Sequence, residues 1–249
     1  MTKTAMVTGA GSGIGRACAL ALAAEGFDVV IVGRRSVALE ETAEMASEGS
    51  GRLIPMPCDV SDAADVGAMF TAVESELGRL DVLFNNAGTN VPATNFGDLE
   101  VGAWDKVIGV NLNGMFYVAH AAYNLMRKQD PRGGRIINNG SISAYVPRPG
   151  AAPYTASKHA VTGLTRAISL DGRQYDIACG QIDIGNTASD MTERMSTGVP
   201  QADGSMKPEP TMNVANVART LVLMATMPEE ANVQFVTVMA TKMPYIGRG

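Results

Sequence analysis

The sequence predicts a single α/β domain built on a doubly wound parallel sheet of about seven strands, with helices on both faces. Apolar runs alternate with amphipathic stretches along the chain, which is typical of βαβ units. Runs such as Val29-Val30-Ile31-Val32 are apolar at consecutive positions, as strands buried on both faces should be. The length of 249 residues suits one domain, spanning 1–249, with a sizeable core.

The elements follow one another in a regular order. The expected strands are 3–8, 27–33, 52–57, 80–85, 134–139, 177–182 and 233–239, and the expected helices are 13–25, 36–48, 62–77, 102–128, 154–174 and 213–226. Residues 186–212 break the alternation, because they are rich in glycine and proline and carry few apolar anchors. A long insertion of this kind is usually functional or disordered, and it follows the sixth strand, at the sheet edge where ligands bind. We expect a lid there, and a solvated loop without a role is the alternative.

Composition excludes several classes of protein. The net charge is -5, and no basic stretch is long enough to indicate nucleic-acid binding. Three cysteines outside any C-x-x-C motif suggest buried thiols in a reducing cytoplasm, and two histidines show no metal-ligand cluster. The N-terminus has no signal-peptide pattern, and no apolar run approaches the roughly 18 residues of a membrane span. We therefore expect a cytoplasmic protein without a nucleic-acid or membrane partner.

A glycine-rich turn joins the first strand to the first helix. It reads T-G-x-x-x-G-x-G over residues 8–15, with Gly9, Gly13 and Gly15, and differs from the common G-x-G-x-x-G spacing. Such a Rossmann-type turn lets a pyrophosphate approach the backbone and rest on the helix N-terminus. A generic glycine-rich turn is the alternative.

Three more motifs carry polar side chains near the ends of strands or in the helices that follow them. Asn85-Asn86-Ala87-Gly88 closes the fourth strand, and Asn111 lies in Val-Asn-Leu-Asn-Gly. Tyr154 and Lys158 form Y-x-x-x-K at a helix start, so they share one helix face, and Ser141 precedes the tyrosine by thirteen residues. Together with the glycine turn, this set resembles the short-chain dehydrogenase/reductase family, in its 3-oxoacyl-carrier-protein-reductase-like subgroup. The resemblance covers nearly the whole chain, in the family's order and spacing.

The resemblance implies a catalytic set of Asn111, Ser141, Tyr154 and Lys158. Tyr154 exchanges a proton with an alcohol or carbonyl while hydride moves to or from the nicotinamide. A free tyrosine has a pKa near 10, and we expect the nearby ammonium and the nicotinamide cation to lower it. Ser141 is expected to hold the substrate oxygen, and Asn111 to position a water against Lys158. The alternative is an ordinary surface Tyr/Lys pair.

The resemblance also implies a nicotinamide dinucleotide site. Asp59 would bond the adenine, with a helix cap as its alternative role. The expected cofactor residues are Gly9, Ser12, Gly13, Ile14, Gly15, Arg34, Arg35, Asp59, Val60, Asn86, Ala87, Gly88, Val110, Tyr154, Lys158, Gly185, Thr187 and Ser189. The second strand ends in Gly33-Arg34-Arg35 and lacks the acidic residue that repels a 2′-phosphate, which favours NADP(H). NAD(H) with two exposed arginines is the alternative.

The chain departs from the family at two turns. Ile184-Gly185 replaces the usual Pro-Gly after the sixth strand, and the last strand does not lead into Asp-Gly-Gly. The resemblance makes 186–212 the lid over substrate and nicotinamide. It also implies a homotetramer, because helices 102–128 and 154–174 hold apolar positions beyond those that one sheet face needs. These positions include Met115, Phe116, Val118, Ala119, Ala122, Val161, Leu164 and Ile168.

The predicted function is NADP(H)-dependent hydride transfer between nicotinamide and a small carbonyl or secondary alcohol. The substrate is left open between 3-oxoacyl groups on an acyl carrier protein, sugars, polyols and other alcohols. A catalytically silent nucleotide-binding regulator is a second class, against which the intact catalytic set counts. A dehydratase or epimerase is a third, but such chains carry a larger C-terminal domain.

Overall fold

The computed structural model describes residues 2–188 and 198–246. Its main sheet has seven strands in the order β3-β2-β1-β4-β5-β6-β9, and every pairing within it is parallel. The strands are β1 (Thr4–Thr8), β2 (Asp28–Gly33), β3 (Leu53–Pro57), β4 (Val82–Asn85), β5 (Gly134–Asn139), β6 (Ile177–Ile184) and β9 (Phe235–Val238). The order reverses between β1 and β4, which places a ligand crevice at their carboxyl ends. The predicted Rossmann-type α/β fold is confirmed.

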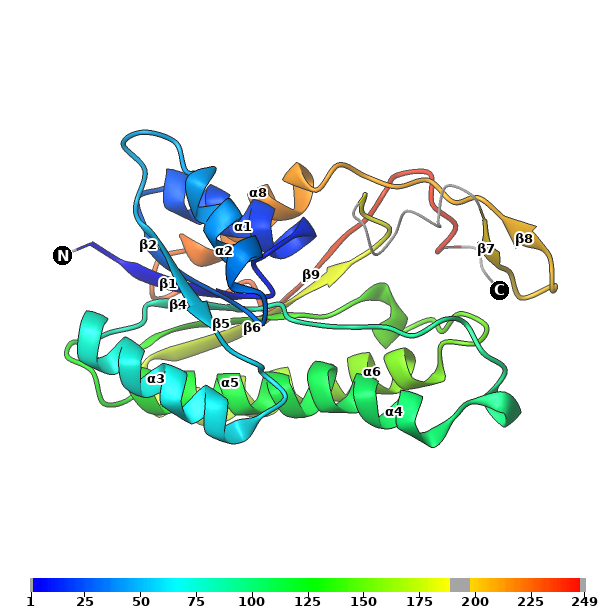
Figure 1. Ribbon diagram of the computed structural model, residues 1–249, viewed down its shortest axis with the longest axis horizontal. Helices are drawn as coiled ribbons and strands as arrows, with labels where there is room; N and C mark the ends of the chain where they lie inside the picture. The colour runs from blue at the N-terminus through cyan, green and yellow to red at the C-terminus, as the bar shows by residue number, and fades with distance from the viewer. Residues whose placement is uncertain (1, 189–197, 247–249) are drawn as a thin grey trace.

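Helices cover both faces of the sheet (Figure 1). The helices α1 (Gly13–Ala24), α2 (Ser36–Glu44) and α8 (Ala215–Ala225) lie on one face. The helices α3 (Ala63–Leu77), α4 (Val101–Ile108), α5 (Met115–Met126) and α6 (Ala152–Gly172) lie on the other. This three-layer arrangement is the one that alternating strands and helices produce, because each crossover returns along one face.

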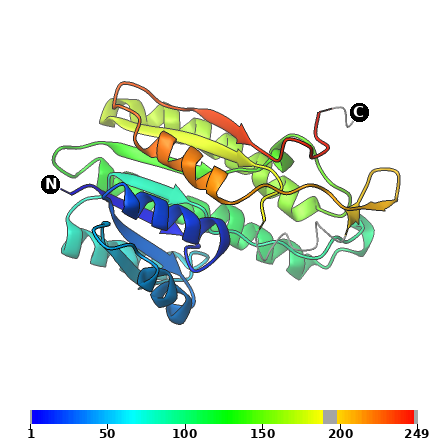
Figure 2. The same cartoon turned by 90° about the horizontal axis from the view of Figure 1, so that it is seen from above.

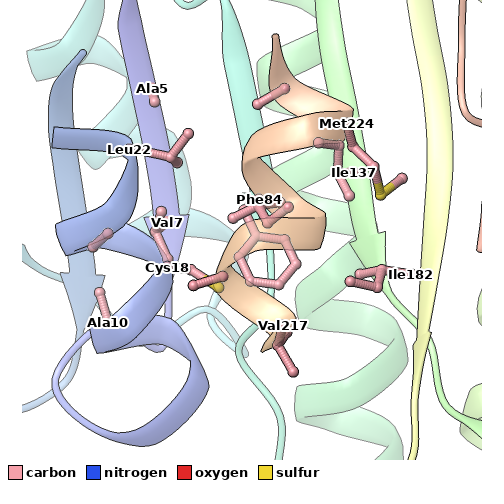
Figure 3. Packing of buried hydrophobic residues seen from close by; sticks show 14 of the residues in the cluster. Ala5, Val7, Ala10, Cys18, Leu22, Phe84, Ile137, Ile182, Val217 and Met224 are labelled. Carbon is pink, nitrogen blue, oxygen red and sulfur yellow. The ribbon is translucent and has the colours of Figure 1, made fainter. Parts of the chain in front are cut away.

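Each face of the sheet has its own hydrophobic core. Consecutive residues of β1 alternate between them: Val7 belongs to the core under α1 and α8, and Met6 to the core over α3 and α5. Figure 3 shows the first core, where Cys18 and Leu22 of α1 and Met224 of α8 pack beside sheet residues. Double-sided burial explains why the strands are apolar at consecutive positions.

The described parts of the expected lid contain a small hairpin. Strands β7 (Val199–Pro200) and β8 (Met206–Lys207) pair antiparallel and extend beyond the carboxyl end of the main sheet (Figure 2). The segment is anchored by Glu209, whose side chain is buried and forms an ion pair with Arg148 at 2.6 Å. Asn186 also donates to this carboxylate, at 2.8 Å. This charge pair thus adds to the few apolar anchors of the segment, the buried side chains of Val199 and Met212.

Two expectations about the helices are corrected. The stretch expected as one helix over 102–128 is divided by a π-helical turn, Gly109–Gly114, between α4 and α5. Most of the apolar residues that were expected to form a subunit interface are instead buried, because the side chains on α5 and α6 cover the sheet. The buried members are Met115, Val118, Ala119, Ala122 and Val161, whereas Phe116 is 47% exposed.

No helix among the described residues is long and apolar enough to cross a bilayer. The three cysteines, Cys18, Cys58 and Cys179, are free and buried. Within the same residues there is no group of three or more His, Cys, Asp or Glu side chains placed to hold a metal ion.

Candidate active site

The glycine turn brings the backbone of β1 against the start of α1. A Cβ on Gly15 would collide with the carbonyl of Gly9 and would lie 2.8 Å from Nδ2 of Asn86. Gly9 has a φ of +69°, in the left-handed region that favours glycine. Ser12 makes no side-chain capping bond to α1, and the first turn of that helix has no acidic residue. The helix N-terminus therefore presents its amides without a carboxylate that would repel a pyrophosphate.

The end of β4 is tied to the same turn by side-chain hydrogen bonds. The hydroxyl of Thr8 accepts from the backbone N–H groups of Asn86 at 2.8 Å and Ala87 at 2.9 Å. The amide of Asn86 donates to the Thr8 carbonyl and accepts from the side chain of Asn139, both at 2.8 Å. The carboxyl ends of β1, β4 and β5 are thus fixed to one another around the crevice.

A cleft of about 570 Å³ opens at this edge. The predicted cofactor residues that line it are Gly9, Ser12, Gly13, Ile14, Gly15, Arg34, Arg35, Asp59, Val60, Asn86, Ala87, Gly88, Val110, Tyr154, Lys158, Gly185 and Thr187. Ser189 lies outside the described residues. Thr89, Asp105, Lys106 and Asn139 also line the cleft and were not predicted. Backbone that approaches closely at Gly15, with open amides on α1, fits a dinucleotide.

Two arginines border the far end of the cleft. Arg34 and Arg35 follow β2, and both are exposed. The Arg34 guanidinium helps to lower the pKa of Asp59, although hydrogen bonds from Ser61 are the larger cause. Asp59 is not a helix cap, because Asp62 holds that position and accepts from the N–H groups of residues 64 and 65. The carboxylate of Asp59 therefore remains on the cleft, as the cofactor interpretation requires.

The tyrosine and lysine lie one helical turn apart on α6. The Lys158 ammonium donates to the carbonyl of Asn139 at 2.7 Å and lies 5.5 Å from the centroid of the Tyr154 ring. Both side chains reach the cleft. The Asn139 carbonyl at the end of β5 thus fixes the ammonium beside the phenol.

Ser141 stands at the other side of the phenol. It follows β5 and caps the short 3-10 turn Ile142–Ala144, where its hydroxyl accepts from the N–H of Ser143 at 3.1 Å. The serine hydroxyl is close enough to Tyr154 to lower the pKa of the phenol by hydrogen bonding. The hydroxyl groups of Ser141 and Tyr154 therefore lie close together beside the cleft.

Asn111 lies in the π-helical turn and is fully buried. Its Oδ1 accepts from the N–H of Thr89 at 2.7 Å, while its Nδ2 donates to the Thr89 carbonyl at 2.9 Å and to Ser157 Oγ at 3.3 Å. Single π turns occur frequently at functional sites. The asparagine side chain is therefore committed to holding the backbone of Thr89, which lines the cleft, and the predicted water relay stays a prediction.

Burial is the largest influence on the pKa values of the proposed catalytic residues Tyr154 and Lys158. It raises the pKa of Tyr154, against the opposing effects of Ser141 and the Arg148 guanidinium. Burial also lowers the pKa of Lys158 to about 8, and the Asp183 carboxylate opposes that shift. Removing the phenol from water outweighs the protein groups that favour its anion. The expected depression of the tyrosine pKa also depends on the nicotinamide cation, so it stays a prediction for the cofactor complex.

Several functional neighbours escaped the sequence analysis. Thr8 and Asn139 end β1 and β5, so their positions directly beside predicted motifs could have indicated them. The contacts of Asp183 with Ser141 and Tyr145 and the Arg148–Glu209 pair gave no local signal, because each joins residues 38 or more positions apart along the chain. Hydrogen bonds between residues so far apart along the chain leave no periodic pattern in the sequence.

Comparisons with known proteins agree with this geometry. Residues 3–199 match the family described as short chain dehydrogenase. A 3beta-hydroxysteroid dehydrogenase of Mediterraneibacter gnavus is 40% identical over 197 residues, covering 79% of this chain and 70% of that protein. The 3-oxoacyl-[acyl-carrier-protein] reductase FabG of Staphylococcus aureus is 38% identical over 198 residues, covering 79% of both chains.

One solved structure resembles this protein over nearly the whole length of both chains. It is a metagenomic short-chain oxidoreductase in complex with NADP, with a TM-score of 0.80 and 27% identity, and the match covers 95% of this chain and 96% of the other. The fold, the site and these relatives lead to one conclusion: the chain belongs to the short-chain dehydrogenase/reductase family, whose members are oxidoreductases that act on carbonyl and alcohol groups with a nicotinamide cofactor.

Proposed function

We propose that this protein is an NADP(H)-dependent reductase of a small carbonyl substrate, able to run in reverse as an alcohol dehydrogenase. The observation that carries the proposal is that Tyr154 and Lys158 line a dinucleotide-sized cleft, with the Ser141 hydroxyl within hydrogen-bonding reach of the Tyr154 phenol. We also propose one catalytic domain over 1–249, with residues 186–212 as the lid over the substrate.

The chain's own residues supply acid–base chemistry and orientation. The bound cofactor supplies the hydride. Ser141 and Tyr154 hold the substrate oxygen, and the Tyr154 phenol donates its proton to that oxygen as the alkoxide forms. Lys158, fixed by the Asn139 carbonyl, places a positive charge beside the tyrosinate that results. Gly185 and Thr187 border the same end of the cleft and would contact the nicotinamide amide, together with Ser189.

At neutral pH the protonation state of Tyr154 suits the proton donation that carbonyl reduction requires. Burial keeps the Tyr154 pKa above its usual value, so the phenol retains the proton that reduction requires. Oxidation requires the tyrosinate, and it should gain as the pH rises. The Lys158 pKa of about 8 places the loss of the ammonium in the same alkaline range.

Preference for NADP(H) rests on Arg34. Solved relatives hold NADP or NADH, so membership of the family does not decide between them. Arg34 and Arg35 both line the cleft, and no ion pair occupies either guanidinium within the described part of the chain. A guanidinium that forms no ion pair suits a phosphate through bidentate, charge-assisted bonds.

The assembly we propose is a homotetramer. The exposed Phe116 on α5 and the half-buried Leu164 on α6 remain available for one interface. Strand β9 is an edge of the main sheet and its residues are only partly covered, which leaves it available for a second. Two kinds of contact with two-fold symmetry close a tetramer.

A substrate panel tests the proposed function. Carbonyls that represent the named activities of the relatives, a 3-oxosteroid and a 3-oxoacyl thioester, are assayed with NADPH and NADH beside simple ketones and sugars. We expect turnover with NADPH, and loss of about 10² to 10⁴-fold in Tyr154→Phe with cofactor affinity retained. A protein that binds NADPH but turns over no carbonyl would instead be a silent nucleotide-binding regulator. Wild-type turnover that Tyr154→Phe leaves within about twofold would reject the proposed acid–base role.

A further inference from the structure

A buried carboxylate lies behind the proposed active site, and the reaction described above does not use it. Asp183, on β6, has no solvent exposure. It accepts hydrogen bonds from the N–H of Ser141 at 2.9 Å, from Nε2 of Gln181 at 2.7 Å and from the hydroxyl of Tyr145 at 2.9 Å. Burial of a carboxylate is costly unless such donors compensate it, so its presence here calls for a reason.

Two of these donors belong to the segment that presents the proposed catalytic serine. Ser141 begins the 3-10 turn Ile142–Ala144, and Tyr145 ends it. One oxygen of Asp183 holds the backbone of Ser141, and the other holds the side chain of Tyr145. The carboxylate therefore fastens both ends of this turn to β6. Tyr145 is 46% exposed, so only its hydroxyl end is held inside.

The backbone beside the carboxylate is shaped to receive it. A Cβ on Gly140 would collide with Oδ1 of Asp183 and would lie 2.6 Å from Nε2 of Gln181. Gln181 is itself held, because it donates to Thr162 Oγ1 and accepts from Thr165 Oγ1, both at 3.0 Å. Asp183 thus occupies a fitted site between β5, β6 and α6.

The charge of the Asp183 carboxylate also affects the proposed catalytic residues Tyr154 and Lys158. Its charge acts on Lys158 and on Tyr154, and it raises the pKa of both. From the loop before α6, the Arg148 guanidinium acts on Tyr154 in the opposite direction. Asp183 accepts a hydrogen bond from Tyr145 in the turn and interacts through its charge with Lys158 on α6.

We propose that Asp183 is a positioning residue of this enzyme. Its carboxylate holds the serine-bearing turn in place on β6, and its buried negative charge acts on the proposed catalytic tyrosine and lysine. This proposal rests on the proposed function, because the turn is of interest only if Ser141 orients a substrate.

Two variants separate the hydrogen bonds from the charge. Asp183→Asn keeps an acceptor for the Ser141 N–H but removes the charge. Asp183→Ala removes both. We expect Asp183→Ala to reduce kcat by about tenfold or more through displacement of Ser141, with NADPH affinity within about twofold. We expect Asp183→Asn to keep most of kcat and to lower the apparent pKa of turnover by about half a pH unit or more, because the carboxylate raises the pKa of both titrating groups.

The matched control is Thr162→Val, which removes another hydrogen bond of Gln181, and the long bond of 3.4 Å from the Thr162 hydroxyl to the Lys158 carbonyl, without touching Asp183. It should move neither kcat nor the pH profile. If Thr162→Val changes them as much as the Asp183 variants do, the effect is general to the buried polar network and the proposal is overturned. An unchanged pH profile in Asp183→Asn also overturns it. Asp183→Asn decides the matter even where Asp183→Ala does not fold.

A second readout does not depend on turnover. The 13Cε resonance of Lys158, assigned with Lys158→Arg, is titrated by NMR in the wild type and in Asp183→Asn. The proposal predicts a midpoint near the expected value of about 8 in the wild type and a lower one in the variant. Equal midpoints refute the role of the charge. Failure of the proposed function would appear separately, as a wild type without turnover whose Lys158 titration still responds to Asp183→Asn.

Discussion

Replacing Gly15 by alanine tests the geometry of the cofactor turn. The new Cβ would collide with the Gly9 carbonyl oxygen, lie 2.7 Å from the Gly9 carbonyl carbon and lie 2.8 Å from Nδ2 of Asn86. Two of these atoms are backbone, so the turn must move. Overpacking of this kind costs about 1–3 kcal/mol, which outweighs the gain of up to about 1 kcal/mol from alanine in a helix. Displaced amides should also weaken NADPH binding by about tenfold or more, since a hydrogen bond to a charged group contributes about 1.5–3 kcal/mol.

The assays are thermal unfolding and a fluorescence titration with NADPH. The matched control is Gly67→Ala in α3, where a Cβ meets nothing within 4 Å. The control should stabilise the fold by about 0.5–1 kcal/mol and raise the melting temperature, at about 2–4 °C per kcal/mol for a chain of this size, without changing affinity. A Gly15→Ala protein that melts and binds NADPH like the wild type would refute the reasoning.

Three further outcomes follow from the site. Arg34→Ala should raise KM for NADPH by about tenfold or more and leave KM for NADH nearly unchanged, because only NADPH carries the 2′-phosphate; equal effects in steady-state kinetics would indicate a structural role. Reduction should decline as the pH rises through about 8, where Lys158 loses its proton, whereas oxidation should gain only at higher pH, where the Tyr154 anion forms, so parallel pH profiles in the two directions would contradict the assignment. Light scattering should give four times the subunit mass of 26.0 kDa, and a mass near one subunit would reject the tetramer.

The fold and the cofactor cleft could be predicted from sequence because their signals are local. Strands apolar at consecutive positions, such as Val29 to Val32, reveal burial on both faces without any knowledge of partners. The glycine spacing of residues 8–15 marks a close approach of backbone to backbone, which the blocked Cβ position of Gly15 demonstrates.

The remaining features depend on contacts between residues that are distant in the sequence, and no local pattern predicts such contacts. The π turn at Gly109–Gly114 was not predicted, because one extra residue per turn leaves no periodic trace over so short a length. The apolar residues of α5 and α6 indicated an interface, but most cover the molecule's own sheet, which only the packing could show. Asp183 resembles any polar residue at a strand end until Ser141, Gln181 and Tyr145 are seen to converge on it.

The most direct test of the central claim is isotope transfer in a single turnover. The protein is mixed with NADPH deuterated at nicotinamide C4 and with the best carbonyl of the panel, and the product alcohol is examined by mass spectrometry and NMR. Hydride transfer predicts deuterium on the carbinol carbon with the wild type and a loss of product formation in Tyr154→Phe, which still binds NADPH. Product without deuterium from either C4-labelled epimer of NADPH would contradict the account.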